Sequence, residues 1–131
     1  MDSLEIHLSP DQFHHHGRCA LSSEDFIVEL FCYDTGVPAV RLKNSRGFLE
    51  VLPYCGQMIW SARFDGVNLT MGSPFRAPRP TQDLLATYGC FLYHSGILRN
   101  GNRQAFIISI LCRVVDIQRI MIFELKAPFV E

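Results

Sequence analysis

The chain has 131 residues, of which 48% are hydrophobic and 19% charged, and its formal net charge is -1. This length is enough for one domain with a real core and too short for two ordinary domains, and the composition excludes a disordered chain. The near-neutral charge gives no electrostatic basis for binding nucleic acid or an anionic membrane, and no stretch reaches the roughly 18 apolar residues of a spanning helix.

Two features mark the N-terminal region. Residues 4–8 alternate apolar and polar side chains, which predicts a half-buried strand that Ser9-Pro10-Asp11 ends. His14, His15 and His16 then follow one another directly. Neighbouring residues of a strand point to opposite faces, and no Asp, Glu or Cys at a ligand-like spacing completes a metal site. We therefore expect a solvated loop here, with no metal and no cofactor.

The next segments predict an antiparallel meander. Residues 26–33 (FIVELFCY) are β-branched and aromatic, which is typical of a strand. Residues 34–36 (DTG) turn the chain into a second strand over 37–42, and residues 44–47 (NSRG) turn it into a third over 48–52. Tight turns of this length join antiparallel neighbours.

A further hairpin is expected after Pro53. Residues 57–64 alternate, with Met58, Trp60, Ala62 and Phe64 on one face, and Asp65-Gly66 is a strong turn signal before a return strand over 67–71. Residues 72–83 hold three prolines and read as an irregular loop. Residues 88–93 fit either a strand or a buried helix segment.

The C-terminal tail is strongly apolar and β-branched. It can form two strands, over 106–115 and 120–125, or it can be unselected sequence that follows a reading-frame shift or gene truncation. No alternation of strands and helices and no internal repeat is visible, so the sequence predicts an all-β fold of packed antiparallel sheets.

Export and disulfide bonding are not expected. The first residues (MDSLEIHLSPDQ) are acidic and lack the apolar core of a signal peptide, which predicts a cytoplasmic protein. The cysteines are odd in number, scattered and without a C-x-x-C pair, which favours reduced thiols at Cys19, Cys32, Cys55, Cys90 and Cys112.

Residues 52–101 combine aromatic and polar side chains at high density. Aromatic rings can cover the C–H face of a sugar while amide, Arg and His groups bind its hydroxyls, so this composition fits a carbohydrate pocket. Aromatic residues and glycines also build any β-sandwich core, and composition alone favours that interpretation over a pocket. Both interpretations stay open. The polar members are Gln57, Arg63, Asp65, Asn68, His94, Arg99 and Asn100.

The order of the motifs is more specific than the composition. LPYCGQMIW, FDGVNLTM and YGCFLYHSGILRNG follow one another after FCYDTGVPAVRLKNSRGFLEVLP. Together they resemble the N-terminal half of bacterial galactose mutarotase-like proteins in the aldose 1-epimerase-related group. The resemblance ends at Asn102, after about three quarters of the chain. It implies that residues 1–102 are the N-terminal part of a mutarotase-type β-supersandwich and that residues 103–131 are a divergent tail.

Catalysis is not expected of this chain. Anomeric epimerisation needs a general base and a general acid, and the family uses a His and a carboxylate that lie beyond the point where the resemblance ends. The resemblance places His94 and Arg99 near substrate. Alternatively, His94 is a hydrogen-bonded strand-end residue and Arg99 a solvated loop charge. No His follows Asn102, so no catalytic residue can be assigned.

The sequence thus predicts a truncated aldose 1-epimerase-like protein that binds carbohydrate and is inactive as an enzyme. The alternative is a small non-catalytic β module that acts through protein–protein contacts. Exposed sheet edges in the tail would support such contacts, including homo-oligomers.

Overall fold

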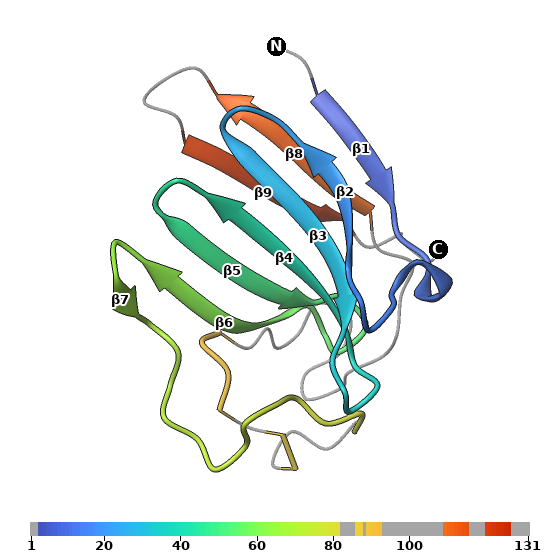
Figure 1. Ribbon diagram of the computed structural model, residues 1–131, viewed down its shortest axis with the longest axis vertical. Coiled ribbons are helices and arrows are strands. Elements are labelled where there is room, and N and C mark those ends of the chain that lie inside the picture. The colour runs from blue at the N-terminus through green and yellow to red at the C-terminus, as the bar shows by residue number, and fades with distance from the viewer. Residues whose placement is uncertain (1–2, 82–85, 88, 93–108, 116–119, 127–131) are drawn as a thin grey trace. The chain divides into compact units, whose positions relative to one another are not determined.

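The computed structural model describes residues 3–81, 86–87, 89–92, 109–115 and 120–126 (Figure 1). The described strands form two separate compact units, one with β1, β8 and β9 and the other with β2 to β7. The only helix among these described residues is the short 3-10 helix η1 (Pro10–Gln12), and none of them forms a helix long and apolar enough to cross a membrane. The all-β, antiparallel prediction is confirmed; the sandwich type stays a prediction.

The larger unit is a six-stranded antiparallel meander in which every strand pairs with its neighbour in sequence. Figure 1 shows these strands following one another from blue to green across the sheet. Their bounds are β2 (Arg18–Ser22), β3 (Phe26–Cys32), β4 (Pro38–Asn44), β5 (Gly47–Leu52), β6 (Met58–Phe64) and β7 (Val67–Asn68). The sequence predicted strands β3, β4, β5 and β6. It did not predict β2.

Local turn chemistry explains why the strands reverse where they do. Between β3 and β4, Gly36 has a φ of 83° and its N–H donates to the carbonyl of Tyr33. Between β4 and β5, the Asn44 side-chain oxygen accepts the backbone N–H groups of Arg46 and Gly47. After β6, Asp65 and Gly66 both have positive φ, as a type I′ hairpin turn requires.

Several predicted boundaries were wrong; β4, for example, covers Pro38–Asn44 and not 37–42. Strand β6 begins at Met58 and not at residue 57, because Gln57 adopts a left-handed φ of 55°. The return strand was predicted over 67–71, but β7 covers only Val67–Asn68. Beyond it, the Asn68 side chain accepts the Thr70 N–H, and the Thr70 hydroxyl takes the place of a backbone acceptor for Ala62 N–H. One backbone hydrogen bond, from Leu69 N–H to the Ala62 carbonyl, continues beyond β7. The side chains of Asn68 and Thr70 supply the other acceptors there.

A β-bulge interrupts the pairing of β5 with β6. Glu50 lies opposite Ser61, but Val51 lies opposite Ile59, so Trp60 is the extra residue. On the other side of β6, an isolated bridge joins Ile59 to Leu92. This extended bridge favours the strand interpretation of the ambiguous apolar segment, of which Tyr88 and Tyr93 lie outside the described residues.

Apolar side chains cover both faces of the meander to different extents. Alternating residues on one face are buried along the strands: Val28, Leu30, Val40, Leu42, Val51 and Ala62. The opposite face has an apolar cluster only towards one end, which is made of Val37, Ala39, Leu52, Met58, Trp60 and Cys90, with Phe75 packed against it. The rest of that second face carries polar residues interspersed with Phe31 and Phe48.

The smaller unit is a three-stranded antiparallel sheet in the order β1-β8-β9. It contains β1 (Ser3–His7), β8 (Ser109–Val115) and β9 (Ile120–Lys126). Strands were predicted at these places, although residues 106–108 lie outside the described residues. The predicted domain boundary between residues 102 and 103 also lies outside them and stays a prediction.

Candidate functional site

A row of polar residues crosses the second face of the meander. Glu29 lies opposite Arg41, Arg41 opposite Glu50, and Glu50 opposite Ser61, on the adjacent strands β3 to β6. Directly opposed residues of antiparallel strands project their side chains to the same face, about 4.5–5.5 Å apart. The register therefore gathers two carboxylates, a guanidinium and a hydroxyl from four strands.

Glu50 is the centre of this row. Its carboxylate is only 6% exposed. Arg41 donates to Glu50 Oε1 through Nε at 2.9 Å and Nη2 at 2.7 Å, and Tyr33 donates its hydroxyl to Oε2 at 2.5 Å. Both carboxylate oxygens are thus engaged, which offsets the cost of burying the charge. The contact of Arg41 Nη1 with Glu29 is longer, 3.4 Å.

Aromatic rings hold the guanidinium in place. The Arg41 Cζ atom lies 4.8 Å from the centroid of the Phe31 ring and 5.7 Å from that of Phe48. The Phe31 ring in turn contacts the Tyr33 ring, with centroids 5.1 Å apart. A guanidinium stacked between rings and bound to a carboxylate loses little further entropy on ligand binding.

These contacts shift two pKa values. Burial raises the pKa of the Tyr33 hydroxyl, and the hydrogen bond to Glu50 and the charge of that carboxylate raise it further. Tyr33 therefore stays a protonated donor at any physiological pH. For Arg41, burial lowers the pKa, but the hydrogen bonds and charge of Glu50 outweigh it, so the pKa is raised overall.

An open cleft of about 270 Å³ lies beside Glu50, and we call it the Glu50 cleft. Three aromatic side chains line it: Tyr33, Trp60 and Phe75. Trp60 is buried in the apolar cluster on one side and faces the cleft on another. Because ligand pockets commonly measure roughly 300–1,000 Å³, this cleft suits a small ligand of about one sugar ring.

The polar lining of the Glu50 cleft comes from β5, β6, β7 and the loop that follows β7. It consists of Glu50, Ser61, Asn68, Thr70, Ser73 and Arg76. Thr70 donates to Ser61 at 3.2 Å and accepts the Ala62 N–H, so these hydroxyls are preoriented. Asn68 uses its side-chain oxygen on Thr70 N–H, and among the described residues its amide N–H groups have no partner.

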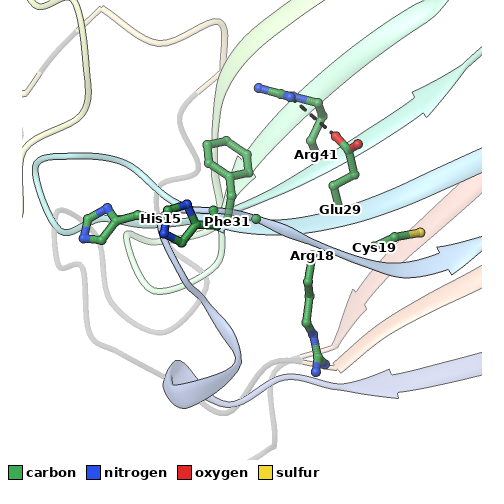
Figure 2. Close-up of a pocket in the computed structure, with 8 residues that line it drawn as sticks. His15, Arg18, Cys19, Glu29, Phe31 and Arg41 are labelled. Carbon is green, nitrogen blue, oxygen red and sulfur yellow. Dashed lines mark hydrogen bonds and ion pairs between the residues drawn. The ribbon is translucent and has the colours of Figure 1, made fainter.

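A second cleft, of about 330 Å³, lies on the other side of the Arg41–Glu50 pair. Figure 2 shows Phe31, Glu29 and Arg41 along it, whereas Arg18 extends away from the Arg41–Glu29 pair. His15 also lines it, but its 3.9 Å approach to Asp34 joins two exposed side chains and contributes little. This cleft has fewer preoriented groups than the Glu50 cleft.

No metal site is apparent in the described part of the chain, where no three His, Cys, Asp or Glu side chains gather in a suitable way. His14, His15 and His16 lie in the loop before β2 and are exposed, as the sequence predicted. Within the same part of the chain, Cys19, Cys32, Cys55 and Cys90 form no disulfide bond.

The residues predicted near substrate, His94 and Arg99, lie outside the described residues, so their roles stay predictions. The Arg41–Glu50–Tyr33 network was not predicted. A signal for it existed, since Glu50 interrupts the apolar run FLEVL and Arg41 interrupts AVRL. A charged residue at such a position needs a buried partner, but the sequence does not show which one.

Comparison with protein-family models, with curated proteins and with solved structures finds no match. The resemblance to galactose mutarotase-like proteins therefore stays an expectation, and the function has to be argued from the clefts themselves.

Proposed function

We propose that this chain binds a carbohydrate in the Glu50 cleft and does not catalyse its epimerisation. The observation that carries the proposal is the lining of one small cleft by Tyr33, Trp60 and Phe75 together with preoriented hydroxyl and amide groups. Aromatic faces cover the apolar side of a sugar ring, while fixed donors and acceptors bind its hydroxyls. The expected truncated relation to the aldose 1-epimerase group agrees with this ligand class.

Glu50 and Tyr33 are better suited to hold a sugar than to move a proton. A general base needs a free lone pair within hydrogen-bond reach of the proton it takes. Glu50 already accepts three hydrogen bonds, from Tyr33 and twice from Arg41. The raised pKa of Tyr33 keeps its proton in place. Binding without acid–base chemistry is the function this arrangement favours.

The only tryptophan of the chain lines the Glu50 cleft, so its fluorescence reports on binding directly. We expect aldoses such as glucose or galactose at millimolar concentration to change Trp60 emission in a saturable way. Isothermal titration of the same protein measures the affinity. Absence of saturable binding by any common neutral or acidic sugar in both measurements would overturn the proposal.

A conservative variant localises the site. Asn68→Asp keeps the side-chain oxygen that accepts Thr70 N–H but removes the amide donors that face the cleft. Losing a hydrogen bond of this kind costs about 1 kcal/mol, so affinity for a neutral sugar should fall roughly fivefold to tenfold. Ser45→Asp adds the same charge at the exposed β4–β5 turn and should leave affinity unchanged.

A second candidate function is a module that acts through protein contacts. Its support is a set of exposed large apolar side chains on the two segments that pair with the outer edge of β6: Val67, Leu69, Met71, Phe91 and Leu92. Exposed apolar surface of this kind commonly marks a contact site. Size-exclusion chromatography with light scattering tests it, since a defined dimer lost in Leu69→Ser would favour it and a clean monomer would argue against self-association.

A further inference from the structure

We propose that the Glu50 cleft selects an anionic monosaccharide, such as a hexuronate or a hexose phosphate, and that Arg76 binds the acidic group. This inference rests on the proposed function of the cleft and adds the class of sugar. It follows from the charges that line the cleft and its surroundings.

Arg41 pairs with both carboxylates of this row, so one guanidinium and two carboxylates carry a net charge of -1 together. Glu50 is bound by Arg41 at 2.7 Å, and Glu29 forms an ion pair with the same guanidinium at 3.4 Å. Arg76 also lines the cleft, and it takes part in no hydrogen bond or ion pair with the described residues. As far as the described residues go, the cleft therefore offers the unpaired positive charge of Arg76 to a ligand.

Further cations lie on the same face next to the cleft. Lys43 and Arg63 flank Phe48 in the neighbouring cross-strand row, and both are exposed. Each lies two residues from a member of the Glu29–Arg41–Glu50–Ser61 row, so it projects to the same face. Neither has an ion-pair partner in the described part of the chain.

The loop after β7, which lines the cleft, carries one more positive charge at Arg79. The Arg79 guanidinium lies 4.9 Å from the ring centroid of Phe75, a residue of the cleft lining. Arg76 thus lines the cleft, Arg79 contacts a residue of its lining, and Lys43 and Arg63 project from the same face of the sheet. These four cations outnumber the single negative charge that the Glu29–Arg41–Glu50 group retains. Such local excess charge concentrates anions at a site.

Guanidinium chemistry identifies the ligand group. Arginine presents a planar fork of donors that fits a carboxylate or a phosphate in bidentate geometry, and these charge-assisted hydrogen bonds are roughly twice as strong as neutral ones. The hydroxyls of a neutral sugar match the polar lining but leave Arg76 without an anionic partner. An acidic sugar provides hydroxyls for the polar lining and an anionic group for Arg76.

The test compares matched sugars on the full 131-residue protein. Isothermal titration and Trp60 fluorescence would measure binding of glucose, glucuronate and glucose 6-phosphate, with acetate and inorganic phosphate as anion controls, at low and high salt. We expect at least one of the acidic sugars to bind about tenfold more tightly than glucose, and the preference to shrink with salt. Arg76→Gln should abolish the preference, so that this variant binds glucose and the acidic sugars with similar affinity.

Arg18→Gln is the matched control, because Arg18 is also an exposed arginine but lies on β2, outside the Glu50 cleft. The Arg18→Gln variant should retain the preference for acidic sugars over glucose. Equal binding of glucose and both acidic sugars would overturn this inference and leave the proposed function standing. Tighter binding of acidic sugars that persists in Arg76→Gln would also overturn it, whereas failure of every sugar to bind would overturn the proposed function as well.

Discussion

Glu50 shows how one buried carboxylate organises a face of the sheet. Its two oxygens accept from Arg41 and Tyr33, so removing it leaves a half-buried guanidinium and a hydroxyl without their main partner. Glu50→Ala should therefore lower the free energy of unfolding by roughly 2–4 kcal/mol. Urea denaturation followed by Trp60 fluorescence measures the loss.

Glu29→Ala provides the comparison for Glu50. Glu29 and Arg41 both have more than a third of their side chains exposed, and their contact is 3.4 Å long. Exposed ion pairs contribute about 0.2–1 kcal/mol, so this variant should remain within about 1 kcal/mol of the parent. Equal losses in the two variants would contradict the central role of Glu50.

Tyr33 makes the free energy of unfolding depend on pH in the alkaline range. Burial and then the Glu50 hydrogen bond and charge raise its pKa in the folded state, whereas the unfolded chain releases the proton near its ordinary pKa of about 10. Above that pH the unfolded state binds fewer protons than the folded state, so the contribution of Tyr33 is complete below about pH 10 and is lost as the pH rises further.

Tyr33→Phe should accordingly flatten the decline of stability above pH 10. Urea midpoints measured from pH 8 to 11 test this. Some decline will remain, because burial and the charge of Asp11 also raise the pKa of Tyr54. The same pH dependence in Tyr33→Phe and the parent would show that Tyr33 is not the titrating group.

At the scale of elements, the β4–β5 turn brings two backbones unusually close. A Cβ atom on Gly47 would lie 1.9 Å from the Arg63 carbonyl oxygen and 2.8 Å from the Phe64 Cα on β6. Neither atom is a flexible side-chain end, so β5 and β6 would have to separate. We expect Gly47→Ala to lower the free energy of unfolding by about 2 kcal/mol or more.

Gly72→Ala is the matched control for Gly47→Ala. A Cβ at Gly72 meets nothing within 4 Å, and the position has no left-handed φ. Such a substitution is neutral or stabilises by about 0.4–1 kcal/mol through the unfolded state. Denaturation midpoints of the two variants should therefore move in different directions or by clearly different amounts.

At the scale of the whole molecule, we predict that the purified chain does not accelerate sugar mutarotation. Each well-placed acid or base contributes about 10²–10⁴-fold. The Glu50 cleft offers a carboxylate with both oxygens engaged and a hydroxyl that keeps its proton. Polarimetry on freshly dissolved α-glucose and α-galactose checks this. Protein-dependent acceleration that disappears in His94→Ala would contradict it.

The sequence by itself determined the all-β class, the meander from β3 to β5, and strand β6 with the turn that follows it. Alternation of side chains and turn residues such as Asn44 and Asp65-Gly66 are local signals, because the strand period and the φ values of a turn depend on neighbouring residues only. The predicted roles of His94 and Arg99 stay untested, since they rest on resemblance and both lie outside the described residues.

Only the tertiary structure decided the site. Arg41 and Tyr33 are 9 and 17 residues from Glu50 in the sequence, and they meet it because the register of three strands brings them together. The bulge that leaves Trp60 unpaired likewise arises from the pairing of β5 with β6. A shift of one residue in the pairing of these strands would turn the side chains to the opposite face. Register is a property of a pair of strands, so no single segment of the sequence determines it.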